Sequence, residues 1–297
     1  MTDSRPGPQD HDLVDLIEKW KNSPQHTVKV TSYFPAYARL FAPLRGKPCV
    51  FIETGILDGG SLFMWRDWLG PQARIIGVDL NPEATKWRDS GFEIHIGDQG
   101  DPEFWRKTFA QIGEFDVLLD DGGHQSFQQI VTASEALRAA KKACLVVVED
   151  TGTSFMKDFR AHGRNTFLQY AKETTDLLVG RLFPLSPDRF PSRFNAKSLE
   201  EFKDVFSVQF FPGIVAFHVD PARCIPPELV RNRENTTASD FRYHGKNAAR
   251  VQWPSLIKGG AVTVKGGGDL RTLFGRALKA ASDPKHFMER VRRLLSR

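Results

Sequence analysis

Four carboxylates stand directly after two apolar runs of the chain, and their types and spacing indicate a site for chemistry. Asp120 and Asp121 close the first run and Glu149 and Asp150 close the second, with 28 residues from Asp121 to Glu149. That interval accommodates one helix, as between neighbouring parallel strands whose carboxyl ends meet at one edge of a sheet. Carboxylate oxygens converging there suit a hard cation such as Mg²⁺ or Mn²⁺. His124, three residues after Asp121, is a candidate general base beside such an ion.

Acidic residues at strand ends also serve as helix N-caps, so a single acid pair would indicate capping more readily than a site. Here both pairs close successive apolar runs, and one of them is followed by a histidine. A charge pair at the tip of a buried strand is costly unless something binds it. The combination favours a functional site over capping.

The elements that must position these residues alternate along the chain. Strands are expected at 49–54, 74–80, 92–97, 115–120 and 144–149, with helices at 61–69, 82–89, 102–112, 127–140 and 166–178. Strands separated by short helices predict a Rossmann-like, doubly wound, mostly parallel sheet. Pro212-Gly213, between apolar runs at 206–211 and 214–219, predicts a hairpin that adds an antiparallel pair at the edge and brings the sheet to seven strands.

A nucleoside site is expected at the same edge of the sheet. The glycine-rich turn 55–60 allows close approach of a ligand to the backbone. A dinucleotide fingerprint needs a glycine where Leu57 stands, so the turn does not support NAD binding. Asp79 ends the second strand, where an acid can bind ribose hydroxyls, and Asp98 ends the third, where it suits an adenine.

The motifs in this order resemble the class I S-adenosylmethionine-dependent methyltransferases. More narrowly, the chain is similar to the magnesium-dependent sugar O-methyltransferases of the macrolide and rhamnosyl type, which are related in sequence to the cephalosporin-hydroxylase-like group. The resemblance covers residues 27–220. Its motifs are Glu53-Thr54-Gly55, Gly59-Gly60-Ser61, Gly77-Val78-Asp79, Gly97-Asp98-Gln99, Asp120-Asp121-Gly122-Gly123-His124 and Val148-Glu149-Asp150.

The resemblance implies a role for each motif residue. The methionine part of S-adenosylmethionine would be framed by Glu53, Gly55 and Ser61. Its ribose would be held by Asp79 and its adenine by Asp98 with Gln99. The metal would be bound by Asp121, Glu149 and Asp150, and His124 would be the general base. The acceptor would be a sugar hydroxyl of a glycosylated natural product or glycan. Gly123 stands where the family commonly has serine, and Lys29 and Tyr33 match an upstream aromatic or histidine region only in part. These departures bear on the acceptor rather than on the chemistry.

The domain organisation follows from the same reading. Residues 1–46 are expected to form a helical segment on the acceptor side, and 47–220 the methyltransferase domain, with 151–204 inserted as an acceptor wall or lid. Residues 221–297 are expected to form a C-terminal extension with basic amphipathic helices. Without a basic, apolar leader or a run of transmembrane length, a cytoplasmic protein is expected.

The positive charge of the chain is concentrated in its tail. Residues 270–297 carry a net +6, which leaves −1 for the rest of a chain whose total is +5, so no nucleic acid partner is expected. A basic amphipathic segment at 268–297 is typical of peripheral contact with an anionic membrane. Packing on the domain or in a subunit interface of a homo-oligomer is the alternative, and the one favoured here.

Two other functions remain open on the sequence alone. A hydroxylase-like or catalytically silent nucleoside-binding member of the same group would share the motifs. A non-haem iron oxygenase is suggested by His218, Asp220 and His244, which have the residue types of a two-histidine, one-carboxylate site. That signature belongs on a β-rich barrel, whereas here it follows five β/α units.

Overall fold

The computed structural model describes residues 8–159, 166–182, 202–230 and 232. The chain divides into two compact units, 1–227 and 228–297, and of the second unit only 228–230 and 232 are described. The amphipathic tail expected at 268–297 and the candidate ligand His244 therefore lie outside the described residues.

A seven-stranded sheet forms the centre of the first unit, in the order β3-β2-β1-β4-β5-β7-β6. The strands are β1 (Cys49–Thr54), β2 (Ala73–Asp79), β3 (Glu93–Ile96), β4 (Val117–Asp120), β5 (Cys144–Val148), β6 (Val205–Phe211) and β7 (Ile214–Val219). The first five are parallel, whereas β7 runs antiparallel to β5 and β6 antiparallel to β7. The predicted fold class, including the antiparallel hairpin at the edge, is confirmed.

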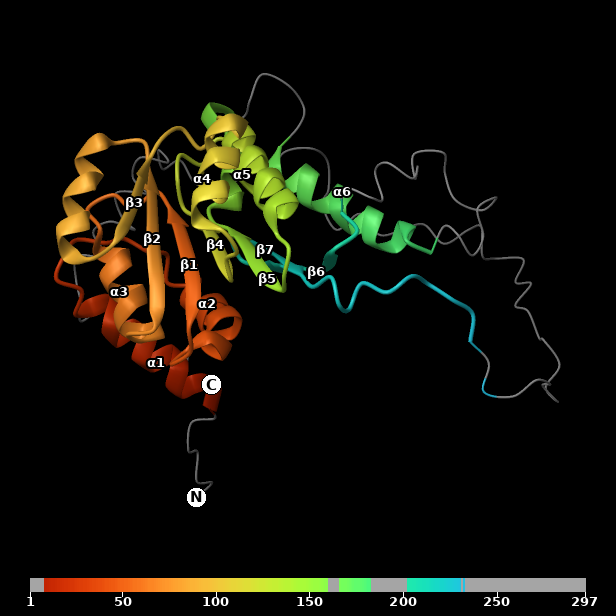
Figure 1. The fold of residues 1–297 in the computed structure, drawn as a ribbon, viewed down its shortest axis with the longest axis horizontal. Coiled ribbons are helices and arrows are strands. Elements are labelled where there is room, and N and C mark those ends of the chain that lie inside the picture. Colours follow the sequence, from red (N-terminus) through yellow and green to blue (C-terminus); the bar gives the residue numbers. More distant parts are fainter. Residues whose placement is uncertain (1–7, 160–165, 183–201, 231, 233–297) are drawn as a thin grey trace, which may run out of the picture. The chain divides into compact units, whose positions relative to one another are not determined.

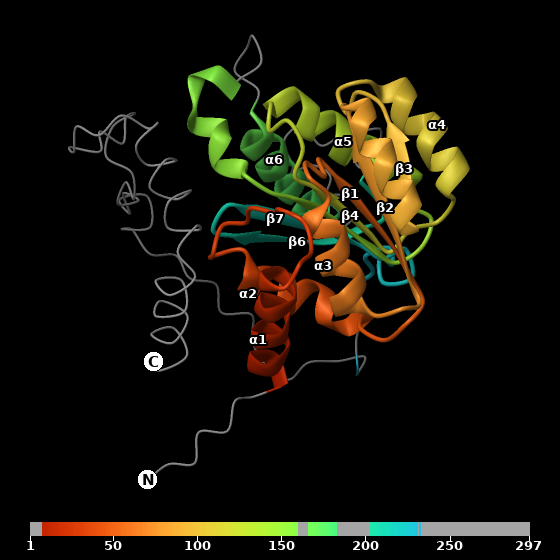
Figure 2. The same ribbon diagram turned by 90° about the vertical axis from the view of Figure 1, so that its left-hand side faces the viewer.

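Helices cover both faces of the sheet (Figures 1 and 2). One face carries α1 (Pro8–Lys21), α2 (Phe34–Phe41) with the short helix η1 (Ala42–Leu44), and α3 (Gly60–Leu69); the other carries α4 (Pro102–Ile112), α5 (Ser126–Ala139) and α6 (Phe167–Gly180). Like η1, the remaining described elements are 3-10 helices: η2 (Pro82–Ser90), η3 (Thr151–Phe155) and η4 (Lys157–Phe159). Each helix of the described part is too short or too polar to cross a lipid bilayer.

The segment expected as a helix at 82–89 is the 3-10 helix η2 rather than an α-helix. Asn81 caps its start by accepting a hydrogen bond from the Glu83 amide at 3.0 Å. The Thr85 hydroxyl donates to the Pro82 carbonyl at 2.8 Å, three residues back, and Gly91 ends the segment with φ of 84°. A tight i to i+3 turn suits so short and polar a connection between strands.

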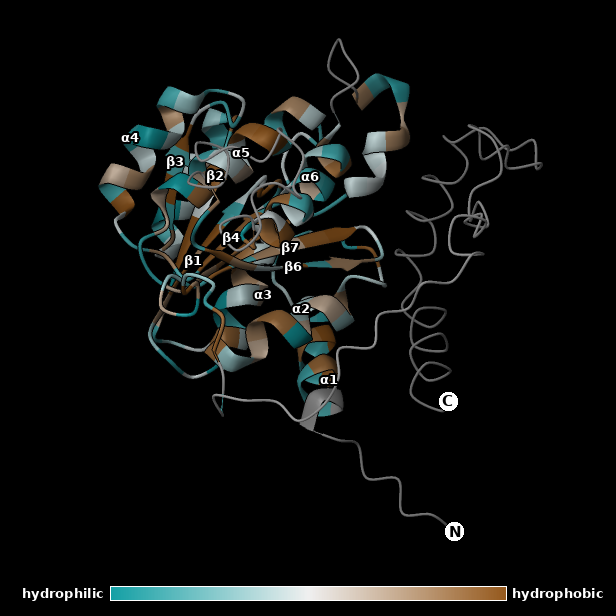
Figure 3. Ribbon diagram, turned by 90° about the vertical axis from the view of Figure 1, so that its right-hand side faces the viewer, coloured by the Kyte–Doolittle hydropathy of each residue, from teal (hydrophilic) through white to brown (hydrophobic). Residues whose placement is uncertain are grey.

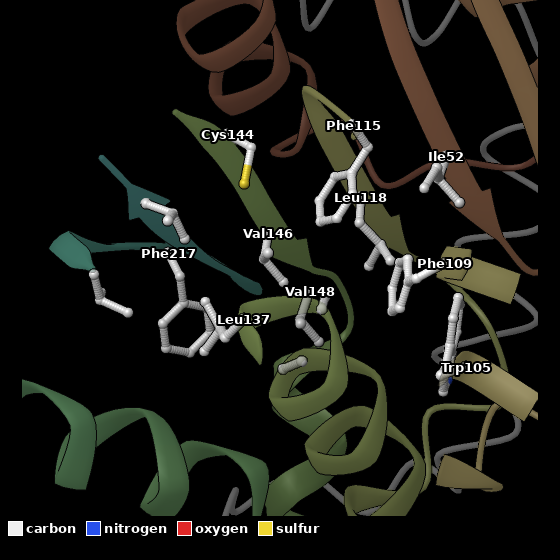
Figure 4. Packing of buried hydrophobic residues seen from close by; sticks show 14 of the residues in the cluster. Ile52, Trp105, Phe109, Phe115, Leu118, Leu137, Cys144, Val146, Val148 and Phe217 are labelled. Atoms are coloured by element: carbon white, nitrogen blue, oxygen red, sulfur yellow. The ribbon is translucent and has the colours of Figure 1, made fainter. Parts of the chain in front are cut away.

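The main core lies between the sheet and the helices α4, α5 and α6. Trp105 and Phe109 of α4 stack with ring centroids 5.2 Å apart, and Phe109 stacks on Phe115 at 5.4 Å. Figure 4 shows these rings beside Leu118 and Val148 of the central strands. The strands are largely hydrophobic in Figure 3, as strands covered on both faces must be. This packing holds the carboxyl ends of β1, β4 and β5 in fixed relative positions.

Residues 22–33, which we call the strap, connect α1 to α2 without a regular helix or strand. The Ser23 hydroxyl donates to the Gly60 carbonyl at 2.8 Å. A Cβ on Gly60 would lie 2.4 Å from the Gln25 carbonyl oxygen and 2.5 Å from that of His26, so only glycine permits this approach. The strap therefore packs directly on the first turn of α3, beside the glycine-rich turn.

Candidate active site

Two of the acids predicted to bind the metal, Asp121 and Glu149, converge at the carboxyl edge of the sheet with Glu53, which was predicted to frame the cofactor. Glu53 is the penultimate residue of β1, Asp121 follows β4, and Glu149 follows β5. Glu53 and Glu149 are almost completely buried, at 0% and 1% exposure. Buried carboxylates need positively charged partners or hydrogen bonds, and the strap supplies a positively charged partner.

Lys29 of the strap reaches into this group of carboxylates. Its Nζ lies 2.5 Å from Asp121 Oδ2, 3.3 Å from Glu53 Oε1, and 3.2 and 3.5 Å from the two carboxylate oxygens of Glu149. The side chain is 1% exposed. The sequence marked Lys29 only as a partial family match. Its partners are 24 to 120 residues away along the chain, so no local pattern connects them.

Burial and mutual interaction shift the pKa values of the residues in this group. Burial lowers the pKa of Lys29, but Asp121, Glu149 and Glu53 more than compensate, so its pKa stands well above the usual value and the ammonium stays charged. Burial raises the pKa of Glu149 well above its usual value and also raises those of Asp121 and Glu53, even though Lys29 acts in the opposite direction. Lys29 thus offsets only part of the increase in carboxyl pKa that burial causes.

A second group shares Asp121 and lies toward solvent. Donor atoms of Asp121, His124 and Asp150 all lie within 4.8 Å of one another. His124 Nε2 is 3.4 Å from Asp150 Oδ2, and the Tyr33 hydroxyl donates to Asp150 Oδ1 at 2.5 Å. The other ring nitrogen of His124, Nδ1, is buried and has no hydrogen-bond partner among the described residues.

Backbone geometry sets the directions of two of these side chains. His124 has φ of 58° and Asp150 has φ of 52°, both in the left-handed region that few side chains adopt. Strained conformations of this kind concentrate at functional sites, where the surrounding structure enforces them. Of the predicted metal and base residues, the structure thus brings together Asp121, His124 and Asp150, and directs Glu149 toward Lys29.

The residues expected to frame a cofactor lie along the same edge. The Asp79 carboxylate accepts the Ile56 amide at 3.0 Å and the Asn81 amide at 2.8 Å, which ties the glycine-rich turn to the end of β2. The Ser61 hydroxyl donates to Glu53 Oε2 at 2.6 Å. Gly55 has φ of 82°, and a Cβ there would lie 2.2 Å from the Asp121 carbonyl oxygen. The turn after β1 therefore touches the acid loop after β4.

Asp98 and Gln99, the residues expected beside an adenine, differ in their surroundings. Asp98 is exposed and accepts the Gly100 amide at 2.7 Å. Gln99 is buried, and its Nε2 donates to Asp120 Oδ1 at 2.9 Å and to Thr132 at 3.2 Å. Its Oε1 accepts the Gly123 amide at 2.7 Å. Gln99 therefore braces the loop that carries Asp121 and His124, a role that the sequence did not predict.

The described residues of the iron-oxygenase alternative lie elsewhere. His218 pairs with Leu145 near the amino end of β5, the end of the strand opposite to Glu149, and its ring packs on Phe206 at 5.9 Å. Asp220 forms an ion pair with Arg223 at 3.1 Å. The two residues are engaged in structural contacts and lie outside the acid site.

Known proteins with a similar sequence or fold identify the architecture. A 3'-O-methyltransferase acting on 8-demethyl-8-(2-methoxy-α-L-rhamnosyl)-tetracenomycin C, from Streptomyces olivaceus, is 34% identical over 149 residues, 45% of this chain and 37% of that protein. The 8-demethyl-8-α-L-rhamnosyl tetracenomycin C 2'-O-methyltransferase of the same organism is 27% identical over 195 residues, 62% of this chain and 49% of the relative. No protein-family model matches the chain.

Among solved structures, the MycE methyltransferase of the mycinamycin biosynthetic pathway, in complex with Mg and SAH, superposes with a TM-score of 0.57. Its sequence is 20% identical, and the alignment covers 76% of this chain and 58% of MycE. The chain has the Rossmann-like methyltransferase fold. The resemblance to the sugar O-methyltransferases predicted from the motifs is confirmed by the sequence matches, although the chain spans half or less of the length of those two relatives.

Proposed function

We propose that this chain is an S-adenosylmethionine-dependent, metal-dependent O-methyltransferase that acts on a sugar hydroxyl of a glycosylated natural product or glycan. The observation that carries the proposal is the direct contact between two sites, where Gly55 of the glycine-rich turn meets the backbone of Asp121. A methyl donor held by the turn would therefore lie next to an acid and histidine group. The similarity to rhamnosyl O-methyltransferases supports a sugar as acceptor.

We assign the methyl donor to the cofactor residues at the carboxyl edge. Asp79 would accept hydrogen bonds from the ribose hydroxyls, because its carboxylate is already oriented by two backbone amides. Glu53, Gly55 and Ser61 would frame the methionine part, and exposed Asp98 would face the adenine. In this proposal Gln99 acts on the adenine side through the loop that it braces.

The metal would be Mg²⁺ or Mn²⁺, since carboxylate oxygens are the ligands these ions prefer. Asp121 and Asp150 fit this role, because one carboxylate oxygen of each lies within 4.8 Å of the other and of a ring nitrogen of His124. When bound, the ion would supply Lewis-acid stabilisation of negative charge on an acceptor oxygen. Glu149, the third ligand predicted from the sequence, is engaged by Lys29.

His124 is the general base of the proposed reaction. Its Nε2 faces the site beside Asp150, whereas its Nδ1 is buried. Asp150 and Asp121 would stabilise the imidazolium formed when Nε2 takes a proton from the acceptor hydroxyl. Tyr33 holds Asp150 in place for this task. Orientation of the acceptor against the methyl donor supplies the remaining acceleration.

We assign the acceptor wall or lid to 151–204, of which 151–159, 166–182 and 202–204 are described. Phe155, in η3 directly after the acid pair, is 72% exposed and could stack on a sugar face. The N-terminal segment 1–46, which contributes Lys29 and Tyr33, would form the other side.

Binding of S-adenosylhomocysteine tests the core of the proposal. Calorimetry should give a dissociation constant in the micromolar range or below with Mg²⁺ present, and no comparable heat with NAD. Incubation with labelled S-adenosylmethionine and rhamnosylated acceptors should then transfer label. Equal or stronger NAD binding would refute the methyltransferase assignment. Binding without transfer to any acceptor in a host extract would instead support the silent nucleoside-binding alternative.

From the sequence we predict that the protein is a cytoplasmic homo-oligomer without a nucleic acid partner. For residues 268–297 the sequence leaves two roles, peripheral contact with a membrane or packing on the domain or in a subunit interface. Removing residues 268–297 separates the last two. Loss of sedimentation with anionic liposomes, with activity and oligomeric state retained, would support membrane contact. Aggregation or a changed oligomeric state, without liposome binding by the full chain, would support packing.

A further inference from the structure

Lys29 divides the acid site into an inner and an outer group. The inner group consists of Lys29, Glu53 and Glu149, whose side chains are all at most 1% exposed. The outer group consists of His124 and Asp150, which are partly exposed. Asp121 connects them, because it contacts Lys29 at 2.5 Å and also belongs to the cluster with His124 and Asp150.

The inner group is a built cation site that is filled by an amino group of the chain itself. An ammonium has three N–H donors and no acceptor, and three carboxylates surround Nζ at 2.5 to 3.3 Å from their nearest oxygens. The aromatic ring of Tyr37 lies below, with its centroid 5.8 Å from Nζ. A buried ammonium with this many charged partners is a permanent part of the structure.

Glu149 is held in the inner group from several directions. Both of its carboxylate oxygens lie within 3.5 Å of Lys29 Nζ, and its backbone carbonyl accepts a hydrogen bond from Gln129 Nε2 at 2.9 Å. Its backbone amide donates to the Asp120 carbonyl at 2.9 Å. To coordinate an ion in the outer group, Glu149 would have to leave Lys29, and the buried ammonium would lose one of its three carboxylate partners, which is costly.

We propose that Lys29 is a positioning residue of the metal site: as the resident cation of the inner group, it withholds Glu149 from coordination and confines a single divalent ion to the outer group, on Asp121 and Asp150. The proposal rests on the metal dependence proposed above. The proposal also assigns a function to the strap, which carries both Lys29 and Tyr33. Lys29 contacts the inner group and Asp121, and Tyr33 donates a hydrogen bond to Asp150 of the outer group.

Binding of Mn²⁺, followed by electron paramagnetic resonance and calorimetry on the full chain, tests the proposal without relying on turnover. The wild type should bind one Mn²⁺. Glu149→Gln, which keeps the shape of the side chain, should bind Mn²⁺ within about threefold of the wild type, whereas Asp150→Asn should bind at least about thirtyfold more weakly. Equal losses in the two variants would make Glu149 a ligand and overturn the proposal.

Lys29→Met should bind Mn²⁺ at least about tenfold more tightly than the wild type or take up a second ion, because a nearby positive charge is removed and Glu149 is released. Lys29→Arg, which keeps the charge, should stay close to the wild type. The matched control is Lys142→Met, which removes a lysine paired with Asp116 at 2.7 Å at the amino end of β4 and should leave Mn²⁺ binding unchanged.

Two results from the lysine variants would also overturn the proposal. In one, Lys29→Met binds Mn²⁺ no more tightly than the wild type. In the other, only Lys29→Met and not the wild type binds Mn²⁺, which would mean that the ammonium replaces the metal. If Lys29→Met does not fold, the comparison of Glu149→Gln with Asp150→Asn decides. S-adenosylhomocysteine binding, measured on every protein, separates failure of the proposed function from failure of this inference.

Discussion

Replacing Asp79 by alanine should weaken binding of S-adenosylhomocysteine by about a hundredfold. In the proposed function the carboxylate accepts two ribose hydroxyls, and a hydrogen bond to a charged group contributes about 1.5 to 3 kcal/mol. Taking the lower value for a partly exposed side chain, the loss is about 3 kcal/mol, and each 1.4 kcal/mol changes a dissociation constant about tenfold.

The same substitution also removes two hydrogen bonds within the protein, so a loss of stability must be distinguished from a loss of ligand affinity. Asp79 accepts the Ile56 and Asn81 amides, and losing these two bonds should lower the free energy of unfolding by about 3 kcal/mol at the same value for each bond. Asp116→Ala is the matched control, because Asp116 accepts the Val50 amide at 2.8 Å and pairs with Lys142 at the other end of the sheet.

Denaturant unfolding and calorimetry on both variants give the result. Asp116→Ala should lose comparable stability and bind S-adenosylhomocysteine like the wild type. A folded Asp79→Ala protein whose dissociation constant stays within about threefold of the wild type would refute the ribose assignment, since 3 kcal/mol cannot then come from this carboxylate.

Three further outcomes are expected. His124→Asn is chosen because asparagine tolerates the positive φ of 58° at this position. It should lower turnover by about a hundredfold or more in methyl-transfer assays and leave S-adenosylhomocysteine affinity unchanged. A loss of turnover of only a few fold would assign proton removal to another group. In urea unfolding, Gly55→Ala should lower the free energy of unfolding by at least about 2 kcal/mol more than Gly113→Ala does. Both glycines have positive φ, but of the two only Gly55 lacks space for a Cβ. Equal losses of stability in the two variants would contradict the close contact of Gly55 with Asp121. Chelation by EDTA should abolish methyl transfer and added Mg²⁺ should restore it, whereas full activity in EDTA would exclude the metal role.

The sequence determined the sheet and the location of the site to a large extent. The predicted strands lie within two residues of their observed bounds, because buried parallel strands are short apolar runs that end in turns or acids. The sequence predicts the acid pairs at the ends of β4 and β5 at the carboxyl edge, and the structure places them there, because a parallel sheet with single-helix crossovers brings those ends together. These conclusions depend on local periodicity and on a general rule of topology.

The tertiary structure alone decided how the site is divided. Lys29 is 92 residues from Asp121 and 120 from Glu149, and it meets them only because the strap packs on Gly60 and crosses the strand ends. The contacts by which Gln99 braces the loop after β4 also come from the tertiary structure alone. Such contacts are set by which side chains can neutralise or hydrogen-bond one another once the backbone has folded. Charge compensation in a buried site depends on distance in space, for which spacing along the chain carries no signal.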